Sequence, residues 1–73
     1  MARYYFHLSN AGDVVRDHFG EEFVREEDAR SHAARVALEL ARNELDHSMN
    51  GRHLIVMDET GRVVCNVPLP VYD

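Results

Sequence analysis

The stretch Glu26–Asp46, EEDARSHAARVALELARNELD, decides the fold. It contains neither glycine nor proline, and its five alanines favour an α-helix. Its first three residues are acidic, and the positive end of a helix dipole stabilises negative charge. Asn50-Gly51 supplies a stop signal beyond it. The sequence therefore predicts one helix from residue 26 to about residue 46.

Short segments rich in aromatic and β-branched residues lie on both sides of this helix, as is typical of strands. The predicted strands are Arg3–Leu8, Val14–Arg16, His53–Asp58 and Val63–Val67. The order ββαββ predicts an α+β fold, in which an antiparallel sheet of two hairpins carries one helix packed on one face. The sequence does not determine the strand order between the hairpins.

Three shorter segments complete this prediction. The residues DHFG at positions 17–20 suit a type I turn, and Phe23-Val24 reads as a short apolar anchor before the helix. Since Pro68 and Pro70 close the last strand, residues 67–73 are expected to form an edge strand or a frayed tail. We expect residues 1–73 to form a single small domain.

The composition limits the protein class. The chain has 73 residues, 45% of them hydrophobic and 29% charged, with a formal net charge of −5 and one cysteine. No run reaches the ~18 apolar residues of a membrane span, and a single cysteine cannot form an intramolecular disulfide. Without an export signal, we expect a cytoplasmic protein. A domain this small often needs a metal ion or a second subunit for stability.

The predicted helix is apolar over about 200°, although a helix on a sheet needs little more than about 100°. One stripe, Ala33/Val36/Leu40, can cover the sheet, which leaves a second stripe uncovered. The second predicted hairpin is also apolar on both faces. The sequence thus predicts an interface, either with a second copy in a homodimer or with another protein. The candidate interface residues are Ala34, Leu38, Leu45, Ile55 and Met57.

A second candidate surface lies on the first predicted hairpin. If Leu8 pairs near Val15, the side chains that point away from the helix are Arg3, Tyr5, His7 and Arg16. Arginines interleaved with an aromatic ring suit single-stranded nucleic acid or an anionic ligand. The alternative is an ordinary solvent-facing sheet surface, which the acidic net charge and the lack of a nucleic-acid motif favour.

Signals for catalysis, metals and cofactors are weak. The five histidines have no metal-ligand spacing, so we expect them to be solvated rather than to bind a metal. No serine has a nucleophile-elbow context, and Cys65 in an apolar strand suits a buried, inert thiol. The isolated glycines form no phosphate loop. The sequence therefore predicts no catalytic residue, no metal and no cofactor.

Four segments carry a resemblance to a family of small uncharacterised bacterial proteins. They are ARYYFHL at the start, DxxG at residues 17–20, the alanine-rich helix, and DETGRVV at residues 58–64. That family is classed as a domain of unknown function, so the resemblance implies a fold and no activity. The family's segment before the helix has a Leu-Pro-Asp-like start, where this chain has Phe23-Val24-Arg25 and lacks an acidic N-cap. A weaker, fold-level resemblance is to HicB-like antitoxin domains.

These observations favour a non-enzymatic, homo-oligomeric protein-binding or regulatory module. The alternative is a small nucleic-acid-binding protein that uses the outer face of the first hairpin.

Overall fold

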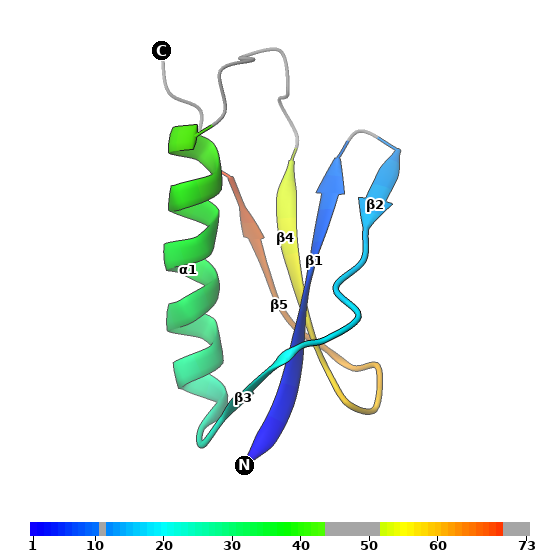
Figure 1. Ribbon diagram of the computed structural model, residues 1–73, viewed down its shortest axis with the longest axis vertical. Coiled ribbons are helices and arrows are strands. Elements are labelled where there is room, and N and C mark those ends of the chain that lie inside the picture. Colours follow the sequence, from blue (N-terminus) through cyan, green and yellow to red (C-terminus); the bar gives the residue numbers. More distant parts are fainter. Residues whose placement is uncertain (11, 44–51, 70–73) are drawn as a thin grey trace.

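The computed structural model describes residues 1–10, 12–43 and 52–69. Within these ranges the chain forms an antiparallel sheet and one helix, which confirms the α+β prediction (Figure 1). The elements, in chain order, are β1 (Ala2–Asn10), β2 (Asp13–Val15), β3 (Glu21–Phe23), α1 (Glu26–Asn43), β4 (His53–Asp58) and β5 (Val63–Pro68). The predicted helix end near residue 46, the stop signal at residues 50–51 and the tail beyond residue 69 lie outside the described residues.

β1 is the central strand of the sheet. The order is β2-β1-β4-β5, and β3 also pairs with β1. The predicted pairing of Leu8 with Val15 is present in the β1–β2 hairpin. The two hairpins join through β1 and β4, where Tyr5 lies opposite Met57 and His7 opposite Ile55. This pairing supplies the strand order that the sequence left open.

The strand β3 corrects the interpretation of Phe23-Val24 as a simple anchor. Glu21–Phe23 pairs with the start of β1, with Ala2 opposite Phe23. The reason is the length of β1, which has nine residues, whereas β2 pairs only with its last three. The first half of the same edge would otherwise expose unpaired backbone groups, so β2 and β3 share that edge with residues 16–20 between them.

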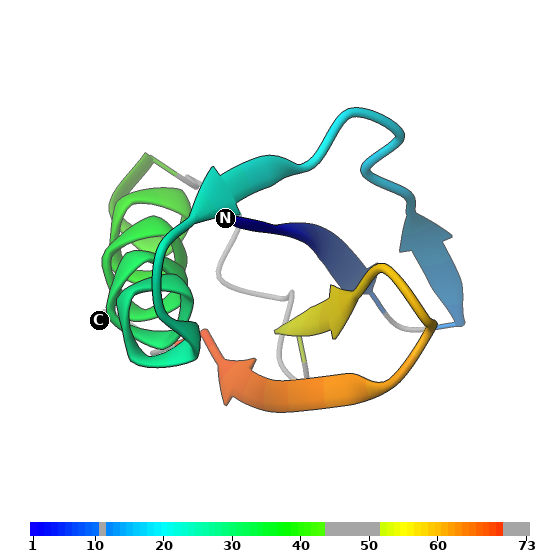
Figure 2. The same ribbon diagram turned by 90° about the horizontal axis from the view of Figure 1, so that it is seen from below.

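The core lies between α1 and one face of the sheet (Figure 2). Ala29, Ala33 and Ala37 are fully buried on the helix, with Val36 and Leu40 partly buried. Because alanine has a short side chain, the helix backbone can approach the sheet closely. The predicted stripe Ala33/Val36/Leu40 does cover the sheet.

The sheet contributes Tyr4, Leu54, Val56 and Val64 to this core. Alternate residues of a strand point to opposite faces, so Tyr4, Phe6 and Leu8 of β1 all face the helix. An irregularity in the β4–β5 pairing lets Val64 and Cys65 both pack on the core side, as a β-bulge does.

The turn between β4 and β5 is closed by Asp58. Its Oδ1 accepts hydrogen bonds from the Thr60 hydroxyl (2.7 Å), the Thr60 amide (2.9 Å) and the Arg62 amide (3.0 Å). The Thr60 hydroxyl is the main cause that lowers the pKa of Asp58 to about 2. The Arg62 guanidinium also donates to Glu26 Oε1 (2.6 Å), which links this turn to the first turn of α1.

Candidate functional site

The face of the sheet that α1 does not cover is called the outer face. It includes Arg3, Tyr5 and His7 of β1, Ile55 and Met57 of β4, and Val63 and Asn66 of β5, where the β-bulge interrupts the alternation. Glu22 of β3 lies on the same face, opposite Arg3. Tyr5, Met57 and Val63 lie opposite one another and form an apolar band across the strands. Within the described ranges, no helix or strand packs over this face (Figure 2).

The outer face combines parts of the two surfaces that the sequence predicted separately. Ile55 and Met57, expected at an interface, lie beside His7 and Tyr5, expected in an anionic-ligand patch. The Tyr5 and His7 rings are parallel within 4°, with their centroids 6.4 Å apart. The sequence did not connect these residues because the pairing of β1 with β4 joins segments far apart in the chain.

The remaining predicted interface residues lie elsewhere. Ala34 and Leu38 are exposed on α1, and Leu38 is 40% exposed. Because α1 packs on the opposite face of the sheet, these two residues are separated from Ile55 and Met57 by the core. Leu45 lies outside the described residues. The predicted interface residues therefore do not form one continuous surface.

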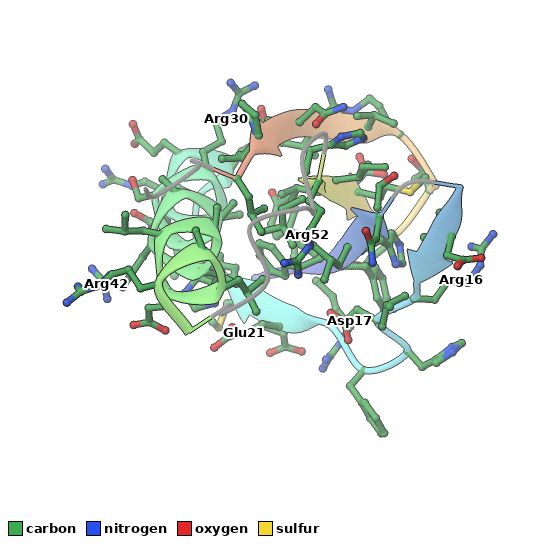
Figure 3. The ribbon with its side chains drawn as sticks, turned by 90° about the horizontal axis from the view of Figure 1, so that it is seen from above. Arg16, Asp17, Glu21, Arg30, Arg42 and Arg52 are labelled. Carbon is green, nitrogen blue, oxygen red and sulfur yellow. The ribbon has the colours of Figure 1, made fainter. Side chains whose placement is uncertain are left out.

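Arg3 is held within the fold. Its guanidinium donates to the Phe19 carbonyl (2.7 Å) and to Glu22 Oε1 (3.1 Å), and its amide donates to Glu59 Oε1 (2.9 Å). Arg16 is exposed and lies just after β2, at the rim of the molecule (Figure 3). The two arginines thus do not converge on one ligand position.

The turn at residues 17–20 is organised by the Asp17 carboxylate. Its Oδ1 accepts from the amides of Phe19 and Gly20, and its Oδ2 accepts from the amide of Phe6, each at 3.1 Å. The Asp17 amide in turn donates to His7 Nδ1 (3.0 Å). Burial alone would raise the pKa of Asp17, but the three amide hydrogen bonds outweigh it and lower that pKa.

Gly20 lets this turn lie directly against β1. Its φ is +70°, which favours glycine, and a Cβ there would lie 2.9 Å from both Arg3 Cγ and the Tyr4 carbonyl oxygen. The preceding residue, Phe19, is 84% exposed. The sequence predicted Phe19 only as part of a turn and not as an exposed aromatic residue. The signal for its exposure was the position of an aromatic residue inside a short DxxG turn.

His32 is not simply solvated, as the sequence analysis expected. Its Nε2 lies 2.9 Å from Glu21 Oε2, and its side chain is 31% exposed. Its ring packs against Phe6 and Phe23, with centroids 5.2 Å and 5.3 Å away. This contact joins α1 to β3 and β1, which is a structural role. Among the described residues, no three metal-ligating side chains gather at one place.

Two further side chains lie near the core. Arg52 is a buried charged residue that the sequence analysis missed, and it lies between α1 and the sheet (Figure 3). No sequence signal marked it, because it is a single arginine before a strand. Cys65 is partly buried, and burial raises the pKa of its thiol.

The helix that the structure describes is too short or too polar to cross a membrane.

A family model described as "Domain of unknown function (DUF6894)" matches residues 3–70. The chain belongs to the DUF6894 family. No curated protein and no solved structure shows a significant match to it. The resemblance to HicB-like antitoxin domains therefore receives no support from these comparisons.

In this DUF6894 chain, the two short motifs that carried the resemblance have structural roles. The DxxG motif at residues 17–20 fastens the loop between β2 and β3 to the central strand. The DETGR segment closes the β4–β5 hairpin, and Gly61 takes a φ of +89° there. Both motifs thus serve the fold.

Proposed function

We propose that this protein is a non-enzymatic binding module that forms a homodimer through its outer face. The observation that carries the proposal is the apolar band Tyr5–Met57–Val63, which no described helix or strand covers, whereas the opposite face of β1, β4 and β5 holds the core against α1. A sheet with one wet face normally presents polar side chains there. A second copy would supply the missing layer.

The edges of the sheet favour a contact between faces over one between edge strands. Along one edge, residues 16–20 interrupt β2 and β3, so no continuous row of backbone groups is offered. At the other edge, the Val64 carbonyl accepts from Arg30 (3.3 Å) and Pro68 has no amide hydrogen. Interruptions and prolines of this kind block strand addition.

The charge distribution is compatible with a second copy on the outer face. Two chains of net charge −5 repel each other, so they can approach only where carboxylates are few or neutralised. The first turn of α1 carries three acidic residues. On the outer face, by contrast, Glu22 is opposite Arg3 and forms an ion pair with it (3.1 Å).

The ionisable groups with shifted pKa values support a non-enzymatic role. The Asp17 and Asp58 carboxylates are engaged with backbone amides of their own turns. The raised pKa of Cys65 keeps its thiol protonated near neutral pH, and a thiol is a poor nucleophile. These contacts favour a structural role for the three groups.

The test is light scattering on a sizing column over a range of protein concentrations. We expect a dimer for the wild type, a monomer for Met57→Glu, and a dimer for the control Leu38→Glu on the exposed side of α1. Circular dichroism checks that each variant is folded. A monomeric wild type, or a Met57→Glu variant that still dimerises, would refute the proposal. Excess absorbance at 260 nm with the monomer would favour nucleic-acid binding instead.

A further inference from the structure

We draw no further inference here: the strongest candidate, the apolar surface patch that the exposed Phe19 ring forms in the turn between β2 and β3, carries nothing, because nothing in the structure shows what covers it.

Discussion

Replacement of Asp17 by alanine should destabilise the protein strongly, although the residue lies in a surface turn. The substitution removes the acceptor for three backbone amides, those of Phe6, Phe19 and Gly20. The Phe6 amide belongs to the central strand and points into the gap between β2 and β3. No backbone acceptor is paired with it there, so the aspartate takes the place of a strand.

The size of the effect follows from these bonds. The Phe6 amide, in the central strand, costs about 1–3 kcal/mol when it is left without an acceptor, and each of the two turn amides, which water can partly satisfy, adds about 0.5 kcal/mol. We expect a loss of about 2–4 kcal/mol. A domain of this length has a total stability of about 4–11 kcal/mol, so the loss is a large fraction of it.

The assay is urea unfolding followed by circular dichroism, with linear extrapolation to water. Asp17→Asn should be almost as unstable, because its amide group would place a donor against the Phe6 amide. The matched control is Asp13→Ala, an exposed aspartate of β2, which should change the stability by less than about 0.5 kcal/mol. An Asp17→Ala variant within about 0.5 kcal/mol of the wild type would refute this account of the DxxG turn.

Two further predictions concern pH and the helix start. Asp17 and Asp58 have lowered pKa values in the folded chain, that of Asp58 about 2, so the unfolded chain binds more protons as the pH falls. Stability should therefore fall from about pH 4 downward, and Asp58→Asn should flatten this slope in urea titrations; an unchanged slope would contradict the assignment. Arg25→Ser should raise the stability by about 1 kcal/mol, since the Arg25 carbonyl begins the helix bonding while its side chain cannot accept from the first amides. A thermal midpoint that does not rise would show that the first turn of α1 is already satisfied.

The sequence predicted which residues of a strand or of the helix share one face, because local periodicity controls this property. Alternation along the predicted strand Arg3–Leu8 predicts that Tyr4, Phe6 and Leu8 share one face, and the structure packs all three toward the helix. The stripe Ala33/Val36/Leu40 followed from 3.6 residues per turn. In both cases the neighbours that decide the outcome lie within a few residues of one another.

The sequence did not predict the features that depend on contacts between segments far apart in the chain. Glu21–Phe23 has no alternation of its own and becomes a strand only because β1 extends beside it. β1 and β4 are separated in the sequence by the whole helix, and only their pairing in the sheet brings Tyr5 and Met57 together. The exposure of Phe19 likewise depends on contacts of its turn with Arg3 and the central strand.

Stability and self-association should be separable in this protein, with one exception. Met57 lies outside the buried core cluster, so Met57→Glu should change association and leave unfolding almost unaffected. Asp17 connects the two properties, because its carboxylate accepts from the Phe6 amide, between the outer-face residues Tyr5 and His7 of the central strand. If the outer face forms the dimer, Asp17→Ala should weaken association even under conditions where the variant is fully folded. The loss should not exceed that of Met57→Glu, since a loosened strand can still bind at an entropic cost.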